Sequence, residues 1–313
     1  MDIAEKKQTV CKVKFAGICG SDVNKLKQSN SEYNPLFLGH EIVCVDNHNT
    51  YYVVNPFVCN NCNRCSEESL NHCSLVRRIG SNFDYGGYSG YVKLPKENLF
   101  ALPASVEPKI GVLTDGIAVI MHSLHYIDSS YQRVAIIGSG SIALLFALVY
   151  NYYEPNKDIV FVCRNKKKEE FISNFYSNVF KTIDIDSFKA SKDSFDLIIE
   201  AVGGNQSESI DLSIDALSNN GRLIVLGAFD DSVCKINNLR NLFFKQISVK
   251  GINSYCLTNN DFEKAFKWTL LNSTKLERLI TDEYHIKRNN VTADGIKQIV
   301  LEPHFIKGVI VYE

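Results

Sequence analysis

Four cysteines lie within one short polar stretch of the sequence, with the spacing C-x₂-C-x₂-C-x₇-C. Thiolates are soft ligands, and four of them with no vacant position suit a closed, tetrahedral structural Zn²⁺. An iron–sulfur cluster is the competing interpretation, but the fourth cysteine comes later than in a ferredoxin run and no proline follows it. The pattern predicts one structural zinc ion, held by Cys59, Cys62, Cys65 and Cys73.

Three other cysteines occur in or beside apolar stretches, where a free thiol behaves as a small hydrophobic side chain. These are Cys44, Cys163 and Cys234. With ten cysteines and no secretion signal, metal ligands and buried thiols are favoured over a disulfide framework.

A second metal site is indicated by Cys19 in GICGSD and His40 in GHE, where flanking glycines let the backbone turn tightly. A catalytic zinc needs a third protein ligand and an open position. The segment LTDGIAVIMHSLHY offers Asp115 and His122, which lie on one face of a helix. The residue pattern alone leaves both open. Taken singly, each candidate also has an ordinary structural role, such as a buried thiol, a core histidine or a helix N-cap.

A nucleotide-binding loop is predicted at GSGSIA, which follows the strand RVAII and opens the helix IALLFALVY. The first glycine allows the tight turn, the second lets the backbone approach a pyrophosphate, and the helix N-terminus favours phosphate. The loop residues expected to bind the cofactor are Gly138, Ser139, Gly140, Ser141 and Ile142.

The next strand ends in Cys163, Arg164 and Asn165, where an NAD enzyme would present an acid to the ribose 2′-OH. Arg164 can pair with a 2′-phosphate instead, so NADP(H) is expected over NAD(H). The competing interpretation is a solvated basic helix start.

The elements that must position these residues change in character along the chain. The first 100 residues read as short β segments separated by Gly, Asn and Pro. From Arg133 apolar strands alternate with helices, which predicts a doubly wound parallel sheet. We expect a catalytic domain over 1–123 with the zinc lobe at 56–75, a dinucleotide-binding domain over 124–263, and a return segment over 264–313.

Bulk composition excludes several classes of function. The chain has 313 residues, 45% hydrophobic content and a formal net charge of −1, with no basic stripe for nucleic acid or an anionic membrane. The first residues lack an apolar signal core, and no apolar run approaches the roughly 20 residues of a membrane span. A cytoplasmic protein that acts on a small molecule is expected.

Taken together and in this order, GICGSD, GHE and the cysteine motif resemble the medium-chain zinc alcohol and polyol dehydrogenases, in the branch of sorbitol dehydrogenase. The resemblance extends through GGYSGYVKLP and the nucleotide half to the closing strand. It implies an α/β Rossmann domain beside a β-rich, GroES-like catalytic domain, and a homodimer or homotetramer. It also implies that Cys19, His40 and Asp115 hold the catalytic zinc. Asp is one methylene shorter than the family Glu. Glu41 is therefore expected either to bind the metal as well or to contact a metal ligand without binding the metal.

The resemblance assigns further roles. Ser21 matches the hydroxyl that takes the substrate proton, Asp22 matches the carboxylate that orients the histidine, and Asn24 stands where many members have a relay histidine. Four residues from FDLIIEAVG and GRLIVLGAF match segments beside the cofactor: Ala201, Val202, Leu226 and Ala228.

The expected reaction is hydride transfer between NADP(H) and a secondary alcohol or ketone, on a polyol, sugar or sugar phosphate, with two zinc ions per chain. A simple alcohol or aldehyde reductase of the same fold is an alternative. A zinc and nucleotide sensor is another, but it would not need the open metal site.

Overall fold

The computed structural model describes residues 8–28, 33–58, 76–81, 85–176, 178–204, 206–227, 234–255 and 260–313. The chain forms two compact units, one of residues 1–119 with 254–313 and one of residues 120–253. The chain re-enters the first unit at residue 254, whereas the sequence led us to expect the boundary at position 264. Aromatic packing explains the earlier return, because Tyr255 contacts Phe57 at 4.9 Å and Phe262 contacts Phe100 at 5.2 Å between ring centroids.

The first unit is built on a seven-stranded sheet of order β14-β15-β1-β2-β3-β7, with β6 paired to the first half of β1. Its strands are β1 (Gln8–Gly17), β2 (Glu41–Val45), β3 (Tyr51–Val54), β6 (Tyr91–Pro95), β7 (Leu99–Ala101), β14 (Ile280–Ile286) and β15 (Lys307–Tyr312). A separate two-stranded ribbon pairs β4 (Phe57–Val58) with β5 (Arg77–Arg78). The β-rich lobe predicted from the first 100 residues is therefore present.

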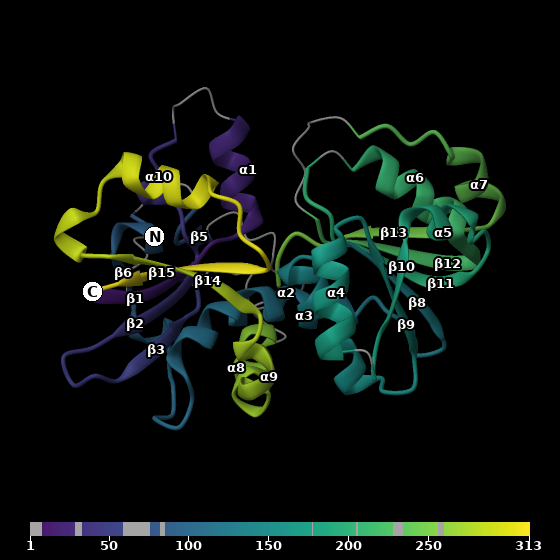
Figure 1. Ribbon diagram of the computed structural model, residues 1–313. Helices are drawn as coiled ribbons and strands as arrows, with labels where there is room; N and C mark the ends of the chain where they lie inside the picture. Colours follow the sequence, from purple (N-terminus) through teal and green to yellow (C-terminus); the bar gives the residue numbers. More distant parts are fainter. Residues whose placement is uncertain are drawn as a thin grey trace, which may run out of the picture. The chain divides into compact units, whose positions relative to one another are not determined.

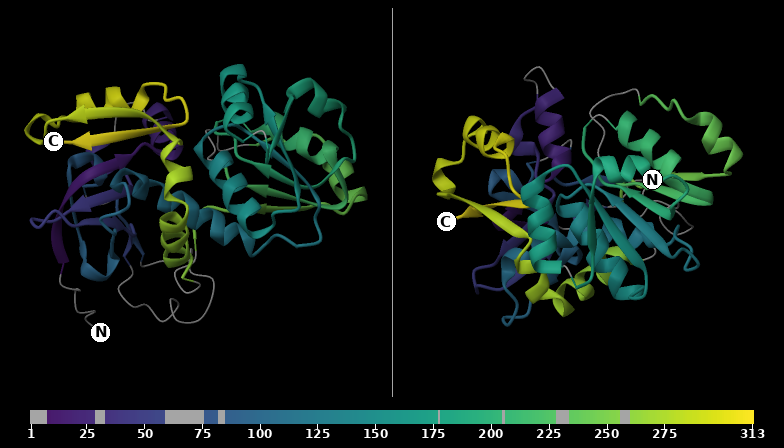
Figure 2. Two further views of the ribbon diagram at one scale, coloured as in Figure 1. Left: turned by 60° about the horizontal axis from the view of Figure 1, so that its bottom comes forward. Right: turned by 45° about the vertical axis from the view of Figure 1, so that its right-hand side comes forward.

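Helices surround this sheet (Figure 1). The α-helices of the unit are α1 (Gly20–Gln28), α2 (Thr114–Leu124, which runs on into the second unit), α8 (Asp261–Leu271), α9 (Ser273–Glu277) and α10 (Ala293–Leu301). Short 3₁₀ helices are η1 (Pro35–Phe37), η4 (Gly87–Ser89), η5 (Lys96–Asn98), η6 (Pro108–Leu113) and η7 (Arg288–Asn290). Helix α10 lies over β14 and β15 (Figure 2) and buries Ile296 and Val300, which are spaced i, i+4.

Helix α1 was not predicted. In GSDVNKLKQ only Asp22 and Leu26 are buried, so the helix shows no apolar stripe that a periodicity search could detect. The buried Asp22 in its first turn is suited to the positive end of the helix dipole, and the Asp22 N–H donates to Cys19 O at 3.0 Å.

The second unit is a six-stranded, wholly parallel sheet of order β10-β9-β8-β11-β12-β13. Its strands are β8 (Arg133–Ile137), β9 (Asp158–Cys163), β10 (Lys181–Asp184), β11 (Phe195–Glu200), β12 (Leu217–Val225) and β13 (Ser248–Gly251). Its helices are α3 (Ser141–Tyr153), α4 (Lys166–Tyr176), α5 (Ile185–Ala190), α6 (Ser207–Ala216) and α7 (Leu239–Phe244), which lie on both faces of the sheet (Figure 1). In chain order the strands are arranged 3-2-1-4-5-6, the arrangement of dinucleotide-binding sheets, and the predicted fold class is confirmed.

Among the described residues, no helix is both long and apolar enough to span a membrane.

Gly17, the last residue of β1, lets the side chains of Glu41 and Val112 approach the backbone more closely than any side chain at this position would allow. A Cβ at this position would lie 3.0 Å from Glu41 Cβ and 3.2 Å from Val112 Cβ, and closer still to the Glu41 carboxylate. We predict that Gly17→Ala destabilises the first unit by about 1–3 kcal/mol through overpacking.

Gly20→Ala is the matched control, since a Cβ there has nothing within 4 Å and the effect should stay below about 0.5 kcal/mol. Calorimetric melting of both variants checks the prediction. Equal melting temperatures for the two would contradict it.

Candidate metal centre and nucleotide site

Strand register brings the predicted metal ligands together. In the β1–β2 ladder Gly17 pairs with Glu41, so Cys19, two residues past the pair, and His40, one residue before it, emerge at the same edge of the sheet. The ligand atoms of Cys19, His40 and Glu41 all lie within 4.8 Å of one another. We call these three residues the ligand cluster.

Asp115, in the first turn of α2, lies beside the cluster. Its Oδ2 is 3.8 Å from His40 Nε2, and the same oxygen is 3.5 Å from Arg78 Nη2. Its Oδ1 accepts a hydrogen bond of 3.1 Å from the Tyr255 hydroxyl. Asp115 is thus close to the cluster but also engaged by two other groups. His122, the other candidate from the sequence, is not part of this cluster.

Asp22 lies against the Nδ1 side of His40. Its Oδ2 lies 3.5 Å from His40 Nδ1 and accepts a hydrogen bond of 2.9 Å from the Tyr88 hydroxyl. Burial by itself lowers the pKa of His40, but the adjacent Asp22 carboxylate raises it, to about 10. With Nδ1 turned toward a carboxylate, the opposite nitrogen, Nε2, faces Asp115 and is available to a metal.

Glu41 forms a buried ion pair with Lys307, the first residue of β15. Both side chains are at most 5% exposed, so each charge needs the other. Strand β15 pairs with β1, with Gly17 opposite Val309, and this register places Lys307 against Glu41. Ser21 donates a hydrogen bond of 3.2 Å to Cys19 Sγ, so its hydroxyl lies directly beside the cluster.

The residues present fit a zinc ion. A thiol, an imidazole and two carboxylates combine the soft and hard ligands that zinc accepts. Two buried atoms, His40 Nδ1 and Asp22 Oδ1, have no hydrogen-bond partner in the described part of the chain, and Asp22 Oδ2 lies 3.5 Å from His40 Nδ1. The arrangement of carboxylate, imidazole and converging ligands is the usual support for a zinc-bound histidine.

The four cysteines predicted to bind a structural zinc, Cys59, Cys62, Cys65 and Cys73, lie outside the described residues. The described residues on either side of that segment are neighbours, because β4 and β5 pair antiparallel with Phe57 opposite Arg78.

The glycine loop of the second unit has the geometry expected of a phosphate site. Gly138 has φ +122°, and a Cβ there would lie 2.8 Å from Ala201 O, so only glycine is suited to the position. Gly140 precedes α3, a Cβ at Gly140 would have nothing within 4 Å, and no side chain caps the helix. Open space before free helical N–H groups, at Ser141 and Ile142, is where a phosphate binds.

The neighbouring strand ends complete this edge of the sheet. Ala201 N donates to Ile137 O at 2.9 Å, and Leu226 N donates to Glu200 O at 2.8 Å. Val202, whose carbonyl accepts from Gln206 Nε2 at 2.9 Å, lies beside them. Ala228 lies outside the described residues.

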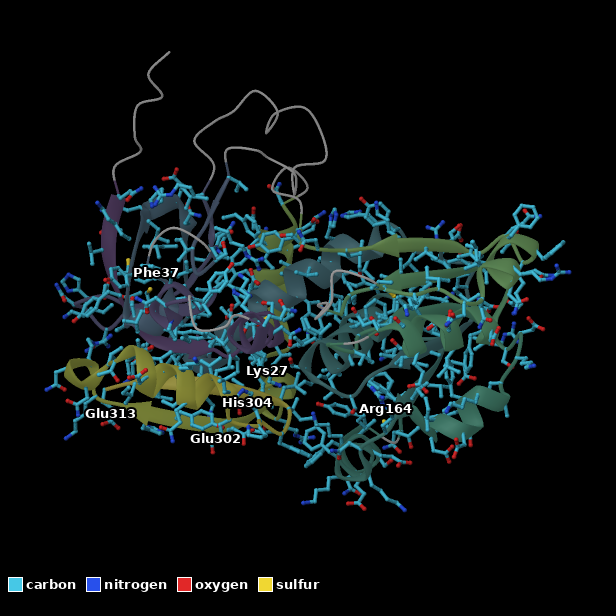
Figure 3. All side chains as sticks on the ribbon, turned by 90° about the horizontal axis from the view of Figure 1, so that it is seen from above. Lys27, Phe37, Arg164, Glu302, His304 and Glu313 are labelled. Carbon is cyan, nitrogen blue, oxygen red and sulfur yellow. The ribbon has the colours of Figure 1, made fainter. Side chains whose placement is uncertain are left out.

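Arg164 and Asn165 follow β9 and have different surroundings. Arg164 is exposed at the surface of its unit (Figure 3) and makes no ion pair or hydrogen bond with the described residues. The Asn165 side chain accepts a hydrogen bond of 3.2 Å from Lys168 N, so it caps α4.

Glu200, fully buried at the end of β11, is a titratable group that the sequence did not single out. Its carboxylate accepts from Ser209 Oγ at 2.8 Å and from Gln206 Nε2 at 2.5 Å, with no cation against it among the described residues. Burial raises the pKa of Glu200 to about 7, although the two hydrogen bonds oppose the shift.

Comparisons with known proteins indicate the family of the chain. Residues 5–104 match the alcohol dehydrogenase GroES-like domain, and residues 138–270 match the zinc-binding dehydrogenase domain. The chain is 27% identical to a sorbitol dehydrogenase of Halalkalibacterium halodurans over 93% of this chain and 89% of that protein.

A galactitol 1-phosphate 5-dehydrogenase of Escherichia coli is 30% identical over 46% of this chain and 45% of its own length. The crystal structure of a galactitol-1-phosphate dehydrogenase from Escherichia coli has the same fold, with a TM-score of 0.78 and 20% identity over 99% of this chain and 94% of that one. An NADP-dependent alcohol dehydrogenase C of Mycobacterium bovis is 28% identical over 69% of this chain and 68% of that protein.

The fold and the two sites define a zinc-binding dehydrogenase, and the chain belongs to the medium-chain zinc alcohol and polyol dehydrogenase family. It is an enzyme of that family, a zinc-dependent alcohol oxidoreductase that uses a nicotinamide nucleotide.

Several residues around the metal centre were missed from the sequence. Tyr88, Arg78, Tyr255 and Lys307 contact Asp22, Asp115 or Glu41. Tyr88 stands in the motif GGYSGYVKLP, whose glycines could have drawn attention to it. No local pattern marks the other three, because they reach the site from distant parts of the chain.

The buried Glu200 predicts a dependence of stability on pH. Its folded-state pKa, about 7, lies above the ordinary value of 4.5, so the folded unit holds the proton more tightly than the unfolded chain. This contribution to stability is complete below about pH 4.5 and is lost as the pH rises to about 7. We expect a loss of about 3 kcal/mol across this window in the wild type, and a flatter dependence in Glu200→Gln.

Thermal unfolding of the second unit between pH 5 and pH 8 measures the effect. Glu208→Gln is the control, because this carboxylate is on the neighbouring helix α6 with its side chain 64% exposed. Parallel curves of melting temperature against pH for the wild type and Glu200→Gln would refute the prediction.

Proposed function

We propose that the chain interconverts a secondary alcohol and a ketone on a polyol, sugar or sugar phosphate, with NADP(H) as the hydride carrier. The observation that carries the proposal is the convergence of Cys19, His40 and Glu41 within 4.8 Å, with a second carboxylate, Asp115, 3.8 Å from His40. An acidic third ligand is typical of the polyol branch of the family. The named activities of the sorbitol and galactitol 1-phosphate relatives support the same substrate classes.

Cys19, His40 and Asp115 would hold the catalytic zinc, with Glu41 in position to enter the coordination. Zinc, when bound, acts as a Lewis acid on the substrate oxygen. Ser21, hydrogen-bonded to Cys19, is the hydroxyl proposed to take the substrate proton. Asp22 holds the imidazole by its Nδ1 side, and Asn24 lies on the next turn of α1, where water would complete the proton route to solvent.

The four cysteines Cys59, Cys62, Cys65 and Cys73 are proposed to hold a second, structural zinc, so we expect about two zinc ions per chain. Cys19→Ser should leave about one, and should lower kcat at least about 100-fold because the polarising metal is lost. Elemental analysis of the purified protein and steady-state kinetics measure the two effects.

Cys11→Ser, in the same strand that leads to Cys19 but outside the cluster, is the control and should keep both ions. A wild-type protein with one zinc ion, or a Cys19→Ser variant with two, would overturn the assignment of the catalytic site. Asp115→Asn and Glu41→Gln, analysed side by side, tell which carboxylate is the third ligand.

The preference for NADP(H) rests on Arg164, which is exposed and has no ion pair or hydrogen bond with the described residues. It lies at the end of β9, where the ribose of a dinucleotide lies in this fold. We expect Arg164→Ala to weaken NADPH binding about 10-fold and to leave NADH binding unchanged, because only the former carries the 2′-phosphate. Fluorescence titration with each nucleotide provides the measurement.

Lys181→Ala is the matched control, because Lys181 starts β10 at the opposite, amino edge of the sheet. A wild-type protein that binds NADH more tightly than NADPH would reverse the proposed preference.

We also infer a homodimer or homotetramer. Strand β13 forms an edge of its sheet with all four residues exposed, and on α7 the side chains of Phe243 and Phe244 are 74% and 64% exposed. A strand edge without a partner among the described residues, and exposed aromatic side chains on the preceding helix, are typical of a surface that a second subunit covers.

A further inference from the structure

Arg78 is a cation next to the ligand cluster that neither the fold nor the proposed roles of the other residues account for. It ends the two-residue strand β5, and its guanidinium carbon lies 5.1 Å from the centre of the Phe57 ring. The guanidinium is stacked on an aromatic face, and 24% of the side chain as a whole is exposed to solvent or a ligand.

Among the described residues, most of the hydrogen-bond donors of Arg78 have no partner. A guanidinium has five N–H donors. The contact with Asp115, at 3.5 Å, is longer than a charge-assisted hydrogen bond, and Nε is buried with no partner among the described residues. By contrast, Lys307 forms a direct, close ion pair with Glu41, the carboxylate within the cluster. Pairing with Asp115 therefore engages only part of the Arg78 guanidinium among the described residues.

The guanidinium lies close to the ligand cluster, where the reacting end of a substrate would bind. The same Asp115 oxygen lies 3.8 Å from His40 Nε2 and 3.5 Å from Arg78 Nη2, so a single carboxylate separates the imidazole from the guanidinium. A molecule whose oxygen occupies the ligand cluster would have its remaining carbon chain within reach of Arg78.

The chemistry of the guanidinium selects the group it would bind. Arg donates but cannot accept, whereas a sugar hydroxyl both donates and accepts. An oxyanion only accepts, and its oxygens match the planar fork of the guanidinium. We propose that Arg78 binds the phosphate of a phosphorylated polyol or ketose, and so makes the enzyme selective for sugar phosphates over neutral polyols. This inference rests on the proposed dehydrogenase function.

The experiment compares the wild type with Arg78→Leu, Arg78→Lys and Arg77→Leu on a panel of pentulose and hexulose phosphates. Each phosphate is paired with its neutral ketose and with a keto sugar acid of similar length, and NADPH oxidation is followed. For the best phosphorylated substrate we expect kcat/KM in the wild type to exceed that of the neutral ketose about 100-fold, and Arg78→Leu to remove that preference. Arg78→Lys keeps the charge beside Asp115 but not the fork, and should retain about a tenth of the preference.

Arg77→Leu is the matched control, since it removes the same charge from the adjacent residue, whose side chain points to the other face of the strand. It should leave the preference unchanged. The same phosphate-to-neutral ratio in Arg78→Leu as in the wild type would overturn the proposal. A dependence on Arg78 for the sugar acid alone would overturn it as well.

A binding measurement separates this inference from the proposed function. Ribitol 5-phosphate should raise the melting temperature of the wild-type holoenzyme more than ribitol does, and this difference should disappear in Arg78→Leu. If no ketose or ketose phosphate is reduced, the proposed function fails, and the binding comparison still decides the role of Arg78. Equal shifts by both compounds in the wild type would contradict the inference even in an active enzyme. Arg78→Lys, which keeps the buried carboxylate paired, provides the comparison if Arg78→Leu does not fold.

Discussion

The pairing of Gly17 with Glu41 is the constraint on which the candidate metal centre depends. Gly17 lies between β2 and β15, opposite Glu41 on one side and Val309 on the other. Successive side chains of a strand point to opposite faces of the sheet. A slip of one residue in the pairing would therefore turn Glu41 away from the site and separate Cys19 from His40. The buried contacts of β1, at Val13 and Ala16, oppose such a slip.

Charge balance is the second requirement of the site. Asp22, Glu41 and Asp115 are all at most 5% exposed, and a buried carboxylate is costly unless it is paired. Each is paired in a different way. Asp22 is held by His40 and a tyrosine hydroxyl, Glu41 by Lys307, and Asp115 by a distant arginine and a second tyrosine. The contact between Asp115 and the arginine, at 3.5 Å, engages one guanidinium nitrogen and leaves other donors for a ligand.

Much of this could be predicted from local sequence. The parallel sheet follows from alternating apolar strands and helices, and the glycine loop follows from a strand, a turn and a helix in succession. Cys19 and His40 were found because glycine-flanked motifs identified them. Helix α1 was missed because it buries only two side chains. Lys307 was missed because its partner is 266 residues away, and only the pairing of β15 with β1 reveals the contact.

The position of β15 has a consequence for how the protein comes to be made. Glu41, from the start of the sequence, meets Lys307 only when β15 joins the same sheet. During synthesis the parallel sheet of residues 120–253 can close on itself while the first unit still lacks two of its strands. Until then Glu41 lacks its lysine partner, so completion of the candidate metal centre has to wait for the synthesis of β15.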